Sequence, residues 1–245
     1  MKKLSAILVG MSLVAGAVMA AEPVTSVNVV GYQKYSAATG SLSLVRCDFL
    51  PVGSGVMNVS NVLGNTLPVG TQLYFWNGSG YQIDTYSSAD SGPPFFTLST
   101  NWSVGTNELK PGSAFWVRLP ASAPQSAYDF VIAGEVPGNA RQPSNSVPVA
   151  PGLNMIGYSY PVDTVWTNTS LSKQAVVGDR LYVWNGSGYG VHNYQVSDSG
   201  PPFFTLSTNW SDLNLVLKTG EGFWYSREAS ASGIIWNESA PYSLP

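Results

Sequence analysis

Residues 73–81 read Leu-Tyr-Phe-Trp-Asn-Gly-Ser-Gly-Tyr, and they return almost unchanged at residues 181–189 as Leu-Tyr-Val-Trp-Asn-Gly-Ser-Gly-Tyr. In the first copy Asn77 and Gly78 stand between two runs rich in aromatic residues. Asn-Gly supplies the positive φ angles that a tight hairpin turn requires. The stretch therefore predicts a β-hairpin that joins a strand over 72–76 to a strand that begins at Tyr81.

The first strand of this hairpin is apolar on both sides. Side chains alternate between the two faces of a strand, so Leu73 and Phe75 share one face and Tyr74 and Trp76 share the other. A strand without a polar face has to be covered on both sides. We therefore expect it to be central in its sheet.

The repeat extends beyond the hairpin at a constant offset of 108 residues. The thirteen residues SGPPFFTLSTNWS at 91–103 reappear without a change at 199–211. We expect two homologous β modules, at 40–136 and 149–245, with a turn-rich linker at 137–148.

The beginning of the chain is typical of a signal peptide. Lys2 and Lys3 precede an apolar run that ends in small residues, so we expect cleavage after residue 20 and a secreted product. No apolar run long enough to span a membrane follows the predicted cleavage site, and no cysteine stands beside it for lipidation. Residues 21–39 have strand character but no second copy in the sequence, and we expect this leader to complete a sheet edge or to bridge the modules.

Charged residues make up only 10% of the chain, against about 25% in most soluble domains. Without Lys2 and Lys3, nine of the 11 basic residues remain against 14 acidic ones, a net charge of about −5. This balance argues against a nucleic-acid partner. Cys47 is the single cysteine, so no internal disulfide is possible, and its apolar surroundings favour a buried strand thiol.

The remaining pattern predicts an all-β chain with no substantial helix after the signal peptide. Short runs of β-branched and aromatic residues alternate with turn residues, which is typical of a β-sandwich or a barrel. The sequence leaves these two architectures open. Further strands are expected at residues 42–49, 114–119, 128–133, 153–158, 222–226 and 233–236.

Four segments together resemble the secreted β-repeat proteins of environmental bacteria, most of them uncharacterised. The segments are VVGY at 29–32, GLNMIG at 152–157, YVWNG at 182–186 and GEGFW at 220–224. The first copy departs from the last motif with PGSAFW at 111–116. The resemblance implies an exported β-repeat protein and no reaction.

The acidic residues do not repeat in the way that a catalytic pair in each module would require. Glycoside hydrolysis usually needs two carboxylates at a fixed separation. Only Asp90 recurs, as Asp198. The Asp-Ser-Gly context favours a turn role for both residues, and the alternative is that they are weak acid candidates for a catalytic site between the modules. The other acids of the first copy are replaced in the second: Asp84 by His192, Glu108 by Val216 and Asp48 by Tyr158.

Other catalytic and cofactor motifs are missing from the sequence. His192 is the only histidine, there is no cysteine pair, and no Gly-x-Ser-x-Gly elbow, Walker loop or calcium loop occurs. We therefore expect no catalytic residue, no metal and no cofactor. The chain is predicted not to be an enzyme.

Recurring aromatic side chains are the candidate ligand-binding residues, because flat rings can stack on the apolar faces of sugars. The alternative is that they form the core, since large aromatics dominate burial in small modules. Core is favoured for Trp116 and Trp224, which lie in strands. The binding candidates are Trp102, Trp210, Trp76, Trp184, Tyr81 and Tyr189.

The verbatim segment at 91–103 and 199–211 has two explanations at the sequence level, a shared constraint or gene conversion. Pro93-Pro94 fixes an extended backbone in which a cis bond is possible, and Phe95-Phe96 can anchor it to the core. The structural interpretation is a long loop pinned across one end of each module. The functional interpretation is a binding or self-assembly surface presented twice.

These observations favour a non-enzymatic, exported structural or adhesive protein of the cell surface or matrix. A carbohydrate-binding protein that uses surface aromatics is the first alternative, and a glycan-active enzyme with a site between the modules is the second. The expected partners are polysaccharides or other copies of the chain.

Overall fold

The computed structural model shows a chain built mostly from strands, with 49% strand and 6% helix. The predicted all-β class with two tandem modules is confirmed. The predicted signal peptide and the first residues of the predicted leader lie outside the part of the chain that the structure describes. The described residues are 29–53, 55–94, 96–139, 142–202 and 204–244.

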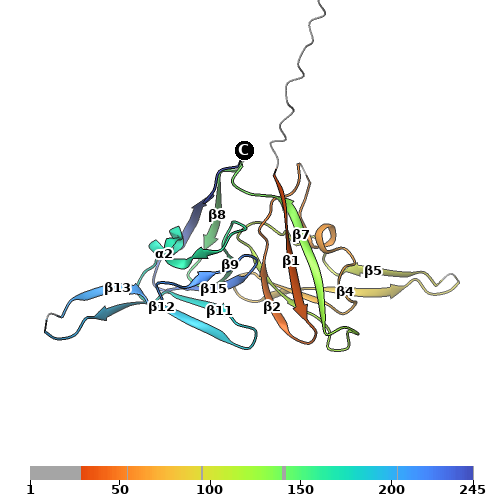
Figure 1. The fold of residues 1–245 in the computed structure, drawn as a ribbon. Helices are drawn as coiled ribbons and strands as arrows, with labels where there is room; N and C mark the ends of the chain where they lie inside the picture. The colour runs from red at the N-terminus through yellow and green to blue at the C-terminus, as the bar shows by residue number, and fades with distance from the viewer. Residues whose placement is uncertain (1–28, 54, 95, 140–141, 203, 245) are drawn as a thin grey trace, which may run out of the picture.

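Each module contains a five-stranded antiparallel sheet, and the order of equivalent strands is the same in both (Figure 1). The first sheet runs β2 (Leu42–Arg46), β6 (Ala114–Arg118), β3 (Gln72–Trp76), β4 (Tyr81–Asp90) and β5 (Leu98–Trp102). The second runs β9 (Gly152–Gly157), β15 (Gly222–Arg227), β11 (Arg180–Trp184), β12 (Tyr189–Asp198) and β13 (Leu206–Trp210).

The prediction that the strand over 72–76 is central is confirmed, because β3 lies third among the five. Leu73 and Phe75 point into the core of their own module, and Tyr74 and Trp76 point to the other module.

The hairpin between β3 and β4 is also present, and β3 ends at Trp76 and β4 begins at Tyr81 as predicted. Trp76 faces Tyr81, so four residues form the loop. The Asn77 side chain accepts hydrogen bonds from the backbone N–H groups of Ser79 and Gly80 at 3.0 and 2.9 Å. Only Gly78 needs a positive φ, of 99°.

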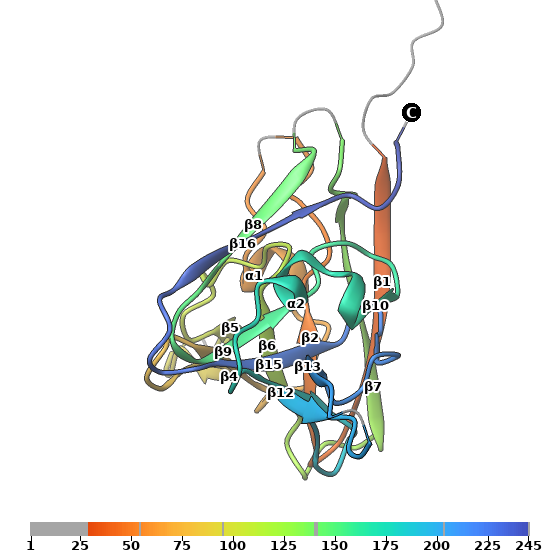
Figure 2. The same ribbon diagram turned by 90° about the vertical axis from the view of Figure 1, so that its left-hand side faces the viewer.

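A two-stranded ribbon covers one face of each sheet. β1 (Val30–Ala38) pairs with β7 (Ala127–Glu135), and β8 (Ser144–Val149) pairs with β16 (Ile234–Ser239). Figure 2 shows β8 and β16 running together above β9 and β15. Each module is therefore a sandwich of a ribbon and a sheet.

The ribbons correct two expectations about the leader and the linker. The leader strand β1 does have a structural counterpart, which is β8, and β8 takes up the last five residues of the predicted linker at 137–148. The two strands differ in sequence because the ribbon requires only that the side chains at alternate positions be buried. Tyr35 and Ala37 point inward from β1, as Val147 and Val149 do from β8.

Short helices close the remaining side of each core. They are α1 (Val59–Leu63) in the first module, and a 3-10 turn, η1 (Trp166–Asn168), followed by α2 (Ser170–Lys173) in the second. A minor pair, β10 (Thr164–Val165) and β14 (Val216–Leu217), accompanies them. Cys47 is fully buried, as predicted, but it lies just after β2 rather than within a strand, and burial raises the pKa of its thiol to about 12. No helix among the described residues has the length and hydrophobicity to span a membrane.

The hairpins β4–β5 and β12–β13 extend from opposite ends of the molecule as two arms, defined here by their described residues, 81–94 with 96–102 and 189–202 with 204–210 (Figure 1). The described residues of the verbatim segment lie at the tip and in the outer strand of each arm. The expected loop pinned across the module is therefore wrong. Phe96 and Phe204, at the tips, are 66% and 63% exposed, because the hairpins carry them away from the cores.

The modules are also joined by a buried ion pair in the first module. Arg46 Nε lies 2.6 Å from Asp48 Oδ1, and both side chains are fully buried. Arg46 donates to the Tyr160 carbonyl, and the Gly220 N–H donates to Asp48, so both partners reach into the second module. Burial raises the pKa of Asp48 to about 6, although Arg46 and the Gly220 N–H lower it.

The strand register also corrects the sequence alignment at this position. Leu44 faces Trp116 and Met155 faces Trp224, so Leu44 and Met155 are equivalent. Counting on from this pair places Asp48 opposite Ser159 rather than Tyr158. The offset between the copies is larger here than in the hairpin because only 22 residues separate β9 from β11, whereas 25 residues separate β2 from β3.

We predict that Asp48→Ala lowers the free energy of unfolding by about 3–5 kcal/mol, because Arg46 is left buried without its counter-charge. Urea denaturation checks this value. The double variant Arg46→Met/Asp48→Leu, which removes both charges, should recover most of the loss. A single variant within about 0.5 kcal/mol of the original chain would contradict the role of the pair.

Candidate functional site

The two sheets meet through the faces that their own ribbons leave uncovered. Leu44 and Trp116 of the first module pack with Met155 and Trp224 of the second. Two isolated bridges join the strands there, Val45 to Glu221 and Ser113 to Ile156. The contacts are related by a pseudo-two-fold axis, since each residue of a pair has its repeat counterpart in the other pair.

Hydrogen bonds fix one tryptophan of each hairpin across this interface. Trp76 Nε1 donates to the Leu153 carbonyl at 2.9 Å, and Trp184 Nε1 donates to the Leu42 carbonyl at 3.2 Å. Leu153 is the counterpart of Leu42. These bonds hold the rings in place before any ligand arrives.

The same tryptophans pack edge-on against the tryptophans of the opposite module. The ring centroids of Trp76 and Trp224 lie 5.2 Å apart, and those of Trp116 and Trp184 lie 5.3 Å apart. Trp116 and Trp224 are almost fully buried. They form an apolar floor, as expected for core residues.

Two pockets open over this floor, and together we call them the aromatic groove. The first has a volume of about 590 Å³ and the second about 370 Å³. Tyr81 and Tyr189 line both, so the pockets are adjacent. The second pocket is lined by Trp76, Tyr81, Leu153, Tyr182, Tyr189 and Trp224, each the counterpart of a residue in the first.

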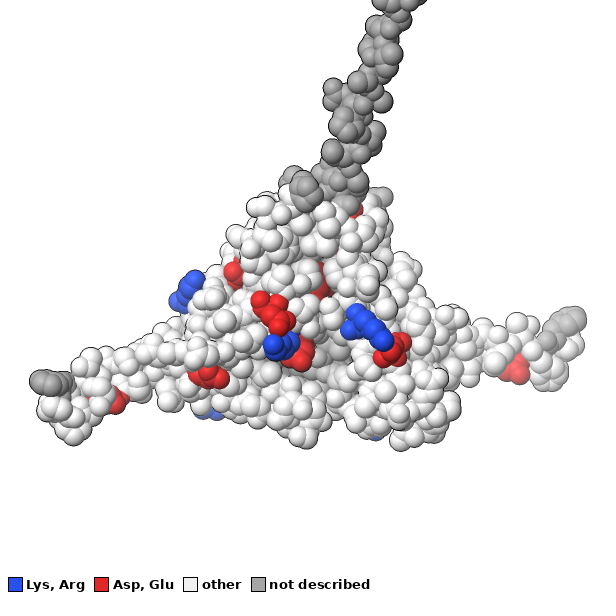
Figure 3. Space-filling view, in the orientation of Figure 1, with Lys and Arg blue, Asp and Glu red and all other residues white. Residues whose placement is uncertain are grey.

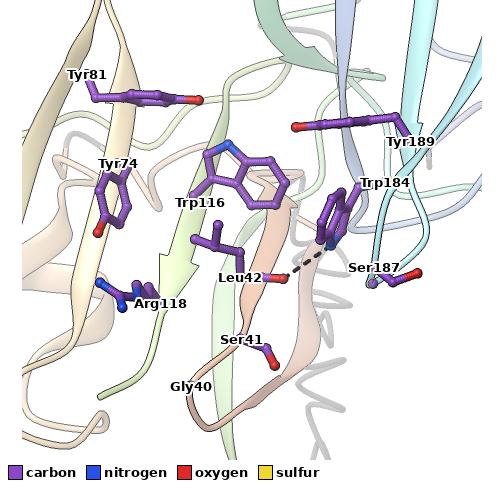
Figure 4. Close-up of a pocket in the computed structure, with 11 residues that line it drawn as sticks. Gly40, Ser41, Leu42, Tyr74, Tyr81, Trp116, Arg118, Trp184, Ser187 and Tyr189 are labelled. Atoms are coloured by element: carbon purple, nitrogen blue, oxygen red, sulfur yellow. Dashed lines mark hydrogen bonds between the residues drawn. The ribbon is translucent and has the colours of Figure 1, made fainter. Parts of the chain in front are cut away.

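Tyr81 and Tyr189 are the exposed aromatic side chains of the groove, at 45% and 43%. Each packs edge-on against the tryptophan of its own hairpin, with centroid separations of 5.3 Å to Trp76 and 5.1 Å to Trp184. In Figure 4 their hydroxyl groups point toward one another above Trp116. Partial burial raises the pKa of Tyr189, the Trp224 indole opposes that rise, and the Tyr81 hydroxyl adds to it.

The first pocket has a polar rim. Tyr74 donates its hydroxyl hydrogen to Gln72 Oε1 at 2.8 Å, and Arg118 Nη1 approaches the same oxygen at 3.4 Å. Ser41 and Ser187 add hydroxyl groups. The counterpart of Arg118 is Ser226, so this basic group breaks the pseudo-symmetry and distinguishes the two pockets.

The structure therefore divides the six predicted binding aromatics into two sets. Trp76, Trp184, Tyr81 and Tyr189 come together in the groove. Trp102 and Trp210 do not, because they are buried in the two separate module cores.

The burial of Trp102 and Trp210 removes them from the binding candidates and favours the alternative that these rings form the core. Trp102 Nε1 donates to the Gly64 carbonyl at 2.9 Å, and Trp210 Nε1 donates to the Ser172 carbonyl at 3.2 Å. Their rings tie the base of each arm to the short helix beside it. They present no free face to a ligand.

Sequence reasoning missed the polar rim of the first pocket. Gln72 and Arg118 face each other across β3 and β6, which no local pattern indicates. The floor residues Trp116 and Trp224 carried a usable signal, since they recur in equivalent strands. Their pairing with the hairpin tryptophans of the opposite module depends on the packing of the sheets.

The acids that recur in the sequence do not meet. Asp90 accepts a hydrogen bond from the Gly92 N–H at 3.0 Å, and Asp198 accepts one from the Gly200 N–H at 3.0 Å, as predicted for turns. They lie in arms at opposite ends of the molecule (Figure 1). A catalytic pair formed by these two residues is excluded by that separation.

His192 and its counterpart Asp84 hold structural positions. Asp84 is buried and accepts hydrogen bonds from the N–H groups of Val104 and Gly105 at 2.8 and 2.7 Å. His192 is half-buried in β12, with Nδ1 3.9 Å from Asp212 Oδ2. In the part of the chain that the structure describes, no three His, Cys, Asp or Glu side chains are grouped as a metal site.

The chain matches no protein-family model, no curated protein and no solved structure. The geometry of the aromatic groove is therefore the basis for the functional argument.

We predict that Trp102→Ala lowers the free energy of unfolding by about 3–5 kcal/mol, because it removes a buried indole and its hydrogen bond. Urea denaturation followed by circular dichroism measures the change. Tyr32→Ala, which removes an exposed tyrosine from β1, is the control and should change stability by no more than about 0.5 kcal/mol. A stable Trp102→Ala variant would contradict the core assignment.

Proposed function

We propose that this chain is a non-enzymatic, secreted carbohydrate-binding protein, and that the aromatic groove is its binding site. The observation that carries the proposal is the pair of half-exposed tyrosines, Tyr81 and Tyr189, held over a floor of tryptophans. Exposed rings on a rigid support suit a ligand that has flat apolar faces.

The chemistry of the groove fits a sugar chain. Ring C–H faces of sugars can stack on Tyr81 and Tyr189, while their hydroxyl groups need hydrogen-bonding partners around the stacked rings. The first pocket supplies these partners through Ser41, Ser187 and Arg118. Binding sites of this kind are mostly apolar with a few polar groups that set orientation.

The size of the groove also fits. Ligand pockets in proteins usually measure about 300–1,000 Å³, and both pockets fall in this range. Because Tyr81 and Tyr189 line both pockets, one oligosaccharide can contact the two of them at once. The groove therefore suits a chain of several sugar units better than a single monosaccharide.

The lining residues favour binding over turnover. Among the described residues that line the two pockets, none carries a carboxylate, an imidazole or a thiol. Hydrolysis of a glycosidic bond normally uses two carboxyl groups on either side of it. A ligand in the groove would meet tyrosine, serine and arginine instead.

A structural or adhesive role is the second candidate, and the arms favour it. They end in exposed apolar side chains that serve neither module core. Leu98 and Leu206 are 69% and 70% exposed. This role is compatible with glycan binding, since a surface protein can hold both a polysaccharide and its neighbours.

We predict that the chain from Ala21 onward is retained on at least one polysaccharide of an array of bacterial, algal and plant glycans. Tyr81→Ala/Tyr189→Ala should weaken that retention at least about tenfold, equivalent to about 1.4 kcal/mol, because both stacking faces are lost. Tyr32→Ala is the matched control and should bind normally.

Three results would contradict the proposal. If no glycan on the array is retained, the groove is not a carbohydrate site. If sugars are released from the array, the chain is not merely a binding protein. Equal retention by the double variant and the original chain would place binding outside the groove.

A further inference from the structure

The outer strands of the two arms are free sheet edges. β5 and β13 each pair with one neighbour, β4 and β12 respectively, and no other strand of the described chain pairs with them. Both strands have the sequence LSTNW. The molecule therefore ends, at both ends, in the same edge.

The backbone groups that point outward from these edges can be identified from the ladder. The Ser91 N–H donates to the Thr97 carbonyl at 3.0 Å, and the Ser103 N–H donates to the Thr85 carbonyl at 2.9 Å. The backbone N–H and C=O groups of the odd-numbered residues of β5 therefore point toward β4. In an antiparallel pair the alternate residues point away, so the N–H and C=O groups of Leu98 and Thr100 face outward. Leu206 and Thr208 do the same in β13.

These edges lack the features that usually prevent strand addition. Natural edge strands are often protected by charged side chains, proline or bulges. Residues 98–102 and 206–210 contain no charge and no proline. On the face shown in Figure 3 the arms carry no basic residue and very little acid.

The pairing inside each arm does not explain why the two edges are identical. β4 and β12 share only three of their ten residues, yet both form the same ladder with the same partner sequence. The arm thus tolerates many sequences on its inner strand. A contact that both edges make with a common partner would restrict the sequence of the outer strand and leave the sequence of the inner strand free to vary.

We propose that this common partner is the arm of a second copy of the chain, added edge to edge as an antiparallel strand. The two arms of one molecule point in opposite directions and cannot meet (Figure 1). With Leu98 facing Thr208 and Thr100 facing Leu206 of the next copy, each facing pair exchanges two backbone hydrogen bonds. The two leucines become diagonal neighbours and cover each other.

The arrangement of the arms determines the form of the assembly. A contact between β5 of one copy and β13 of the next leaves one free edge at each end of the pair. Such a contact repeats and produces an open linear chain of molecules. Since the two edges have the same sequence, a molecule with one blocked arm can still pair through its other arm.

Proline at the centre of each edge tests this proposal. Thr100→Pro removes an outward N–H and leaves the ladder with β4 intact, and Thr208→Pro does the same in the other arm. Sedimentation velocity and electron microscopy should show linear oligomers for the original chain, dimers at most for either single variant, and monomers for the double variant. Thr100→Ala/Thr208→Ala keeps both N–H groups and should assemble like the original chain.

Leu98→Glu/Leu206→Glu keeps every backbone donor but places like charges on facing arms, so it decides the question if the proline variants misfold. It should raise the concentration needed for assembly at least about tenfold. Near-ultraviolet circular dichroism confirms folding, and the arm variants should keep any glycan retention, which separates this test from that of the groove. A chain that is monomeric at all concentrations, or that assembles equally with charged tips, would overturn the proposal.

Discussion

The edge-on packing of Trp76 on Trp224, and of Trp116 on Trp184, joins the two modules across a pseudo-two-fold axis. Each five-stranded sheet is apolar on both faces, because Tyr74 and Trp76 alternate with core residues in β3. The ribbon of a module covers only one of these faces. The second face is covered by the other module, so neither module is complete alone.

This packing leaves the aromatic side chains with different tasks. Trp116 and Trp224 are buried and hold the sheets together, while Tyr81 and Tyr189 close their hairpins and remain half-exposed above them. The exposed rings pack against Trp76 and Trp184, whose indole N–H groups donate hydrogen bonds to the backbone of the opposite module. Rigid support lowers the entropic cost of binding, which is why such a surface suits recognition.

The duplication is symmetric in the backbone but not in every interaction. The buried Arg46–Asp48 pair has no charged counterpart in the second module, where Gly157 and Ser159 stand instead. The groove is likewise polar on one side, at Arg118. By contrast, the outer strands of the arms are identical. The modules have therefore diverged inside and around the groove, while the two ends of the molecule have remained the same.

The sequence by itself determined the features that depend on local alternation and on the repeat. It predicted the hairpin after β3, the central position of β3, the two modules and the strands of both sheets other than β5 and β13, because periodicity, turn residues and self-similarity can be read without knowledge of tertiary contacts. It also indicated turn roles for Asp90 and Asp198.

Only the tertiary structure decided the features that depend on partners distant in the chain. β8 could not be recognised as the counterpart of β1, since a ribbon requires alternate burial and no particular residues. Trp102 and Trp210 stand among polar residues but are buried by helices from elsewhere in the chain. The groove and the projection of the arms arise from how the sheets meet, and packing between distant strands leaves no local pattern in a sequence.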